Sequence, residues 1–232
     1  MDGIIKVVRE SDILIDYFEE SVIQFFEVDK ELIFNDSIER TMVARIFLYL
    51  NQVINNRGSE ILKENYFVDM EYARNVANSQ SLSLVKQLDD GSGNVQFDLV
   101  VHSRGNLKYN KELCLNLDNL LHIEVKKDQW EDENYEKLNK ALRFSDYDKQ
   151  KAFKKHDQFS DCIRLSMTTK YPSENEIVDE RTKLLKNILG YQYGIFLTGL
   201  TKEKTPEYRL FRNGKIILSK RYDQHKQAFI PI

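Results

Sequence analysis

Two apolar segments near the middle of the chain have the length and composition of neighbouring strands. They cover residues 97–101 and 120–125, and each carries charged residues. Asp98 lies in the first segment, and Glu124 and Lys126 lie at the end of the second. Because side chains alternate across a strand, Glu124 and Lys126 share one face. The pattern therefore predicts two carboxylates and an ammonium group at one end of a sheet.

Helical periodicity precedes these strands. Residues 1–34 predict one or two amphipathic helices, which form either a cap on the core or a dimerisation arm. Asn35-Asp36-Ser37 is a helix-start signal, and Gly58 suits the C-terminal cap of the helix that follows. The apolar positions of that helix recur every four residues, at Met42, Ile46, Leu50 and Ile54.

Further strands and helices complete the pattern. Residues 67–74 alternate as a strand with Asp69 and Glu71 on one side, and residues 82–88 predict another strand before a hairpin loop at 89–94. Helices are expected at 128–142, 146–156 and 174–189, a buried strand at 191–200, and a hairpin at Asn213-Gly214. This order predicts an α/β fold with a mixed β-sheet flanked by helices.

Composition narrows the class of protein. Of the 232 residues, 41% are hydrophobic and 11% aromatic, which suffices for a packed core and argues against disorder. No apolar run approaches the roughly 20 residues that span a bilayer, and the N-terminus lacks the apolar region of a secretion signal. Cys114 and Cys162 form no zinc-binding pattern, so reduced thiols in the cytoplasm are expected. The net charge of −3 argues against indiscriminate coating of nucleic acid, but it leaves room for a local basic groove.

The charged residues of the two central strands suit metal-assisted hydrolysis of a phosphodiester. Mg²⁺ prefers oxygen ligands and keeps several waters, so Asp98, Glu124 and the Val125 carbonyl would suffice to bind it. Lys126 would orient or deprotonate the attacking water, or hold the phosphate. Glu39, in the first turn of its predicted helix, is either a further metal ligand or an acid that compensates the helix dipole. The structural alternative is a surface ion pair of Lys126 with Glu124 or Asp98.

The chain resembles the PD-(D/E)xK nuclease superfamily, which has the restriction-endonuclease-like fold, and within it a bacterial or phage branch of uncharacterised members. Asp98 matches the motif aspartate, and Glu124-Val125-Lys126 matches the acid-x-lysine element that follows 26 residues later. Phe97 stands where the motif has proline. Further matches are Glu71-Tyr72-Ala73-Arg74, residues 98–105, residues 119–127, an Asp-x-x-Lys helix at 146–149 or 148–151, and residues 191–194. Together they span residues 36–200.

The resemblance implies a nuclease-like domain over residues 35–232, preceded by a helical extension over 1–34. It implies a Mg²⁺-dependent (or Mn²⁺-dependent) endonuclease that hydrolyses nucleic acid, with DNA as the expected substrate. A non-catalytic module that binds nucleic acid or protein on the same fold is the alternative. We expect a cytoplasmic setting without a membrane partner, and a homodimer is one option for its assembly.

Contacts with nucleic acid must come from local cationic side chains, because the overall charge is negative. The residues expected to make them are His102, Arg104, Lys108, Lys127, Lys149 and Lys151. Glu71 and Arg74 are further candidates for the site.

Overall fold

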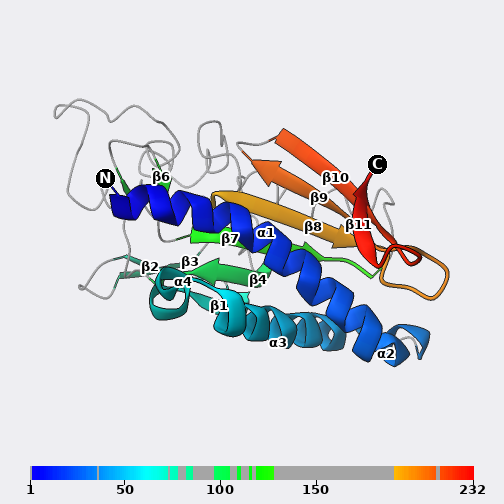
Figure 1. The fold of residues 1–232 in the computed structure, drawn as a ribbon. Helices are drawn as coiled ribbons and strands as arrows, with labels where there is room; N and C mark the ends of the chain where they lie inside the picture. The colour runs from blue at the N-terminus through cyan, green and yellow to red at the C-terminus, as the bar shows by residue number, and fades with distance from the viewer. Residues whose placement is uncertain are drawn as a thin grey trace.

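A mixed sheet organises the part of the chain that the structure describes (Figure 1). The computed structural model describes residues 2–35, 37–72, 74–77, 82–85, 97–104, 109–110, 115–116, 119–127, 191–212 and 215–232. Within these residues the main sheet has seven strands in the spatial order β1-β4-β7-β8-β9-β10-β11. They are β1 (Phe67–Tyr72), β4 (Phe97–His102), β7 (Asn119–Val125), β8 (Tyr193–Thr198), β9 (Glu207–Arg212), β10 (Lys215–Asp223) and β11 (Ala228–Pro231).

Helices and two small hairpins surround this sheet. The described helices are α1 (Asp2–Val28), α2 (Lys30–Phe34), α3 (Glu39–Arg57) and α4 (Glu60–Asn65). The small hairpins pair β2 (Arg74–Ala77) with β3 (Leu82–Val85), and β5 (Tyr109–Asn110) with β6 (Leu115–Asn116). The predicted α/β fold with a mixed sheet is therefore confirmed at this level.

Most of the strand pairing is antiparallel, and β7 with β8 is the parallel pair of the described sheet. Their register runs from Leu121 opposite Tyr193 to Val125 opposite Leu197. Every residue of β7 and β8 is buried, which explains why both strands are near-continuous apolar runs in the sequence. The C-terminal ends of the two strands therefore lie next to each other.

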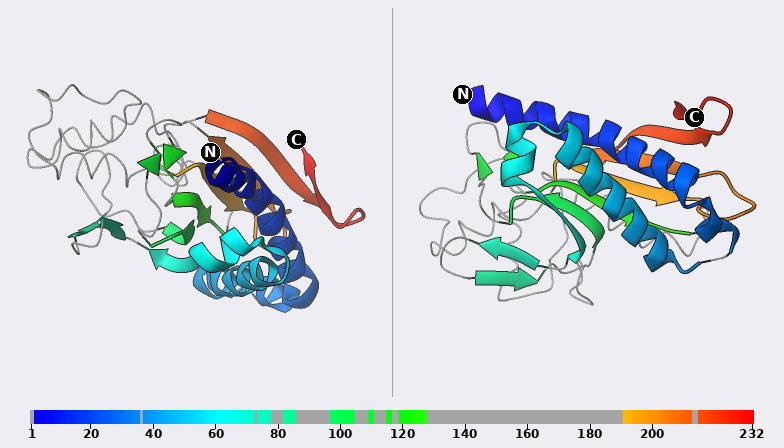
Figure 2. Two further views of the ribbon diagram at one scale, coloured as in Figure 1. Left: turned by 60° about the vertical axis from the view of Figure 1, so that its left-hand side comes forward. Right: turned by 60° about the horizontal axis from the view of Figure 1, so that its bottom comes forward.

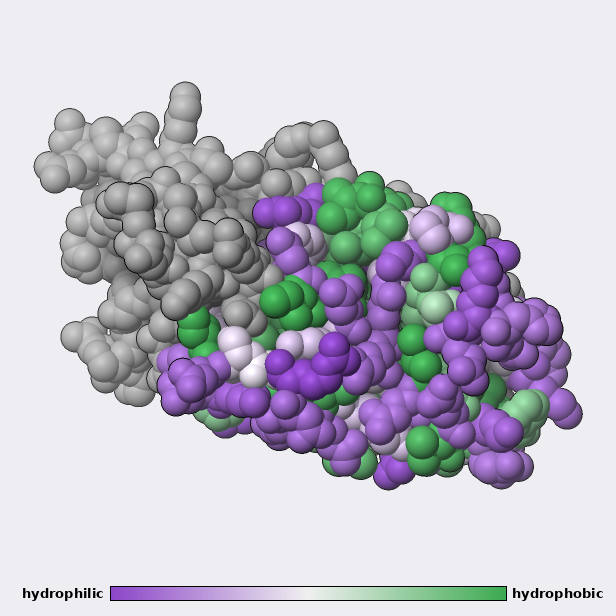
Figure 3. Space-filling view, in the orientation of Figure 1, coloured by the Kyte–Doolittle hydropathy of each residue, from purple (hydrophilic) through white to green (hydrophobic). Residues whose placement is uncertain are grey.

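The main hydrophobic core lies between the sheet and the helices α1 and α3. Figure 2 shows these two helices side by side on one face of the sheet. Alternate residues of the central strands face them, among them Leu99 on β4 and Ile123 and Val125 on β7. The outward face of this helical layer is largely hydrophilic (Figure 3), as expected for amphipathic helices.

Helix α1 is part of this core. Leu14, Phe18, Val22 and Phe25 recur on one face of the helix and are fully buried. The Tyr208 hydroxyl on β9 donates a hydrogen bond to the Glu19 carboxylate, and Lys220 on β10 forms an ion pair with the same group at 2.7 Å. Of the two alternatives for residues 1–34, the contacts are those of a cap on the core.

The two ends of α3 lie close to their predicted positions, and Gly58 is the C-cap as predicted, but the N-terminal cap differs from the prediction. Ile38 occupies the N-cap position and makes no side-chain hydrogen bond there. Gly58 is the C-cap in an extended conformation, with φ −61° and ψ 150°, rather than in the left-handed one. A glycine is still required, because a Cβ atom at this position would overlap the Ile54 carbonyl oxygen, which accepts the Gly58 N–H bond.

Some predicted elements lie outside the described residues. They are the helices at 128–142, 146–156 and 174–189, and the hairpin loop at 89–94. Strand β11 was not predicted from the sequence. None of the helices that the structure describes is long and apolar enough to cross a membrane.

The contact between the sheet and the helices yields a stability prediction. Leu99→Ala should lower the free energy of unfolding by about 2–5 kcal/mol, because Leu99 is fully buried and truncation leaves a cavity. Leu48→Ala on α3 is the matched control: Leu48 is 37% exposed, so its loss should cost below about 1 kcal/mol. Urea denaturation followed by circular dichroism measures both, and equal losses would contradict this account of the core.

Candidate active site

The central feature of the site is the point where β4 and β7 stop pairing through their backbones. The paired residues begin at Leu99 opposite Ile123, and Asp98 precedes this pair on β4 while Glu124 follows it on β7. The Asp98 carboxylate accepts a hydrogen bond from the Val125 backbone N–H, at 2.7 Å from Oδ2. A side chain thus provides the hydrogen bond that the strand ladder would otherwise supply at this position. The arrangement holds the aspartate next to the end of β7.

Glu124 is a fully buried carboxyl group on one of the central strands. Because Ile123 and Val125 face the helical core, alternation places Glu124 on the opposite face of the sheet, and Asp98 likewise alternates with Leu99. Asp98 is partly buried. Two acidic residues therefore lie on neighbouring strands, on the same face and at the same end of the sheet.

Glu39, the first residue of α3, reaches the end of β7. Its Oε2 accepts a hydrogen bond of 3.0 Å from the Lys127 backbone N–H and lies 3.6 Å from the Lys126 Nζ. The Lys126 backbone N–H donates to the Leu197 carbonyl oxygen at 2.7 Å, which joins this segment to β8 as well. The sequence predicted that Glu39 approaches the site, and the contacts show which groups the carboxylate meets: the two lysines that follow Val125.

Arg40, which sequence reasoning missed, follows Glu39 and pairs with Glu71, which was one of the further candidates for the site. The Arg40 guanidinium binds both oxygens of the Glu71 carboxylate, at 2.8 and 3.0 Å. Glu71 has a φ of 49°, a left-handed conformation that is uncommon for a residue with a Cβ atom. Its neighbours pair with Leu99 and Phe97, so Glu71 lies at the level of Asp98 on the adjacent strand. The sequence feature that could have indicated this pair is the position of Arg40 directly after Glu39.

His102 and Arg104 lie at the other end of the sheet. His102 is four residues beyond Asp98 on β4, or about 13 Å at the rise of a strand. The His102 Nε2 lies 2.8 Å from Asp69 Oδ2, and Arg104 binds both Asp69 oxygens, at 2.6 and 2.9 Å. The Arg104 guanidinium also stacks over the Phe67 ring at 4.1 Å from its centroid. Their contacts are those of a structural network, and their expected contact with nucleic acid stays a prediction.

The remaining predicted residues divide into two groups. Lys127 is at the site through its backbone N–H bond to Glu39. Lys108, Lys149 and Lys151 lie outside the described residues, as does the side chain of Arg74.

The donor set can be compared with the needs of a divalent cation. Within the described ranges, no group of three or more His, Cys, Asp or Glu side chains lies close enough to hold a metal ion. The site instead offers the two carboxylates of Asp98 and Glu124, on neighbouring strands, together with the backbone carbonyl of Val125. Such a set fits Mg²⁺, which is commonly bound through one or two carboxylates and keeps several waters. Glu39 is directed toward Lys126 and Lys127 instead.

Comparisons of the chain with protein-family models, with curated proteins and with solved structures found no match.

The network at Asp69 yields a pH prediction. Burial alone would raise the pKa of Asp69, but the hydrogen bonds from Arg104 and His102 outweigh it and lower the pKa below its usual value. A carboxylate with a lowered pKa stabilises the fold above its unfolded pKa of about 3.9, and this stabilisation is lost as the pH falls through the lower folded value. Asp69→Asn should therefore destabilise the protein by on the order of 1–3 kcal/mol at pH 7.

The difference between Asp69→Asn and the wild type should shrink as the pH falls below about 4. Thermal denaturation of both proteins from pH 3 to pH 7 measures this difference. Glu64→Gln, at an exposed position of α4, is the control and should change stability little at any pH. If the stability difference between the wild type and Asp69→Asn stays constant from pH 3 to pH 7, the charge of Asp69 does not contribute to the stability of the fold.

Proposed function

We propose that the protein is a metal-dependent nuclease that hydrolyses phosphodiester bonds of nucleic acid, with DNA as the expected substrate. The observation that carries the proposal is the hydrogen bond from the Val125 backbone N–H to the Asp98 carboxylate where the backbone pairing of β4 and β7 ends, with Glu124 and Lys126 on either side of Val125 in the chain. A buried strand has no structural need for a carboxylate, because burying one is costly. An acidic pair beside a lysine suits a reaction in which a metal, a water and a phosphate must be brought together.

The order of the elements supports a restriction-endonuclease-like core. Helix α3 precedes the antiparallel strands β1, β4 and β7, and β8 then runs parallel to β7. The resemblance of residues 36–200 to the PD-(D/E)xK superfamily implies this same succession. The positions of its motif are Asp98 on β4, Glu124 on β7 and Lys126 directly after β7.

In this proposal Asp98, Glu124 and the Val125 carbonyl would hold the divalent cation, Mg²⁺ or Mn²⁺. The cation, when bound, supplies positive charge that lowers the pKa of a water and stabilises charge on the phosphate. The bond from the Val125 N–H fixes one Asp98 oxygen, which orients the carboxylate before any cation binds. The Asp98 side chain therefore loses little conformational entropy when the cation binds.

Lys126 is the proposed catalytic cation. Its ammonium Nζ orients the attacking water or stabilises charge that develops on the phosphate oxygens. Glu39 is a positioning residue, because its carboxylate contacts both the Lys126 Nζ and the backbone of the next residue. The first turn of α3 therefore restrains the direction in which Lys126 extends from the end of β7.

Two variants test the assignment of the catalytic residues. Lys126→Ala should abolish the cleavage of plasmid and single-stranded DNA and leave DNA binding nearly intact, because a group that acts in the transition state contributes little to ground-state affinity. Asp98→Ala should abolish cleavage through lost metal binding, and it should retain DNA binding in the absence of metal. Calorimetric titration with Mn²⁺ should show near-normal metal affinity for Lys126→Ala and strongly reduced affinity for Asp98→Ala.

Lys63→Ala serves as the matched control, since Lys63 is an exposed lysine on α4. Cleavage by both site variants at the wild-type rate would reject the nuclease assignment. DNA binding by a wild-type protein that cuts no substrate, with either metal, would favour the non-catalytic module instead.

The role of Glu39 gives a separate prediction. Glu39→Ala should lower kcat on the order of tenfold, since it removes a charge-assisted contact that restrains Lys126. Glu39→Gln should lose less, because the amide oxygen can still accept the Lys127 N–H. Neither variant should change Mn²⁺ affinity in calorimetry. A large loss of metal affinity in Glu39→Gln would show that Glu39 is a metal ligand rather than a positioning residue.

A further inference from the structure

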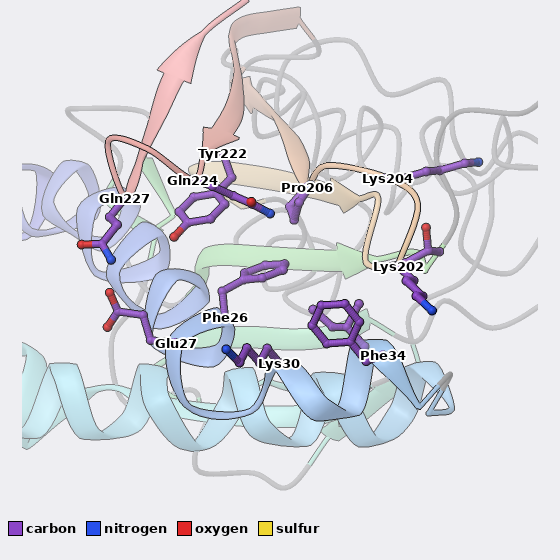
Figure 4. A pocket seen from close by; sticks show the side chains of 12 residues that line it. Phe26, Glu27, Lys30, Phe34, Lys202, Lys204, Pro206, Tyr222, Gln224 and Gln227 are labelled. Atoms are coloured by element: carbon purple, nitrogen blue, oxygen red, sulfur yellow. The ribbon is translucent and has the colours of Figure 1, made fainter.

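A pocket of about 450 Å³ opens between α2 and the loops at one end of the sheet. Its lining comes from the end of α1, from α2, from the loop between β8 and β9, and from the turn between β10 and β11. Figure 4 shows Phe26 and Phe34 on the helical side, with Pro206, Tyr222 and Gln224 across from them. This volume lies within the range of about 300–1,000 Å³ that small-molecule sites occupy.

The aromatic wall of the pocket is held in place. The rings of Phe26 and Tyr222 are stacked, with centroids 5.3 Å apart and an interplanar angle of 21°. The Tyr222 backbone N–H donates to the Pro206 carbonyl oxygen at 2.8 Å, which ties the wall to the β8–β9 loop. Gly199 at the start of that loop has a φ of 80°, and a Cβ atom there would overlap the Thr205 carbonyl oxygen. The glycine therefore lets the start of the loop pass close to the Thr205 carbonyl oxygen at its end.

Phe34 differs from the other aromatic residues of the pocket because it is exposed. Its exposed fraction is 52%, whereas that of Tyr222 is 6%. Figure 4 shows the Phe34 ring beside Lys202. An exposed aromatic ring on a pocket wall offers a surface on which a flat ring can stack, and nucleic-acid bases use such surfaces irrespective of sequence.

The charge of the pocket is opposite in sign to that of the whole chain. Lys30, Lys202 and Lys204 line it and Glu27 is the acid among the lining residues, whereas the chain carries a net charge of −3. Lys30 lies next to Phe26 with its nitrogen on the side away from Phe34, and Lys204 extends away from the other residues (Figure 4). Lys202 is thus the cation placed to meet an anion that enters beside Phe34.

The pocket lies at the same end of the sheet as Lys126. Its β8–β9 loop follows β8 directly, and the Lys126 N–H bonds to Leu197 near the end of that strand. On the helical side, Phe34 ends α2 and Glu39 begins α3. Figure 1 shows α2 and the loop after β8 together at the right-hand end of the molecule. A strand of nucleic acid bound at Lys126 would therefore have this pocket within its reach.

We propose that this pocket binds a nucleotide, with the base stacked on Phe34 and the phosphate bound by Lys202. The amide of Gln224 provides donors and an acceptor for the edge of the base. The assignment of this pocket to a nucleotide of the substrate strand rests on the proposed nuclease function. The binding of a free nucleotide does not rest on it, because Asp98, Glu124 and Lys126 are not among the residues that line the pocket.

Calorimetric titration of the full chain with deoxyadenosine 5′-monophosphate in EDTA tests the pocket. Phe34→Ala should weaken binding about tenfold, and Phe34→Tyr, which keeps the ring, should bind within about twofold of the wild type. Lys202→Ala should weaken binding about fivefold or more, whereas Lys63→Ala, at an exposed lysine on α4, should not. Thermal denaturation verifies that each variant is folded.

Absence of nucleotide binding at millimolar concentration, or equal affinity in Phe34→Ala, would overturn the proposal. A 5′-phosphorylated single-stranded oligodeoxynucleotide is then added as a competitor. Displacement of the mononucleotide supports a site for the substrate strand, and its absence restricts the pocket to free nucleotides. A protein that binds the mononucleotide and cuts no DNA would reject the nuclease function and leave the pocket assignment standing.

Discussion

The burial of the central strands on both faces is the constraint on which the rest of the structure depends. Strands β7 and β8 are buried throughout, and one face of the sheet packs on α1 and α3. A polar group introduced there must be bound by neighbouring groups, since an isolated buried charge costs several kcal/mol. Asp98 and Glu124 occur at this location, at the end where the backbone ladder is replaced by a carboxylate bond. The core thus determines where charged chemistry can be placed and how rigidly it is held.

The sequence was sufficient to place the elements that depend on local periodicity. The apolar repeat of α3 and the runs of β4, β7 and β8 were each recognisable, because a helix or a buried strand imposes its period on the residues it contains. These elements needed no knowledge of which distant side chains meet. Glu39 was expected either as a further metal ligand or as an acid that compensates the helix dipole, and its contacts with Lys126 and Lys127 were not foreseen.

Contacts between distant residues were not predictable in the same way. Arg40 with Glu71 and Arg104 with Asp69 join residues separated by 31 and 35 positions, and no periodicity marks such pairs. His102 and Arg104 follow Asp98 closely in sequence, yet a strand of six residues carries them to the opposite end of the sheet. Gly58 illustrates another limit: its position was foreseeable, but neither its extended conformation nor the close approach of the Ile54 carbonyl oxygen, which leaves no room for a Cβ atom, could be read from the sequence.

The left-handed conformation of Glu71 has a consequence for how copies of the protein can associate. Among the strands that the structure describes, β1 is the outer strand on one side of the sheet and β11 is the outer strand on the other. Glu71 interrupts the regular backbone of β1, and β11 is four residues long and contains Pro231, which has no N–H to donate. Irregular, short or proline-containing edges are those on which a further strand cannot be added readily. The sheet is thereby protected against edge-to-edge aggregation, and a dimer would be expected to form through another surface.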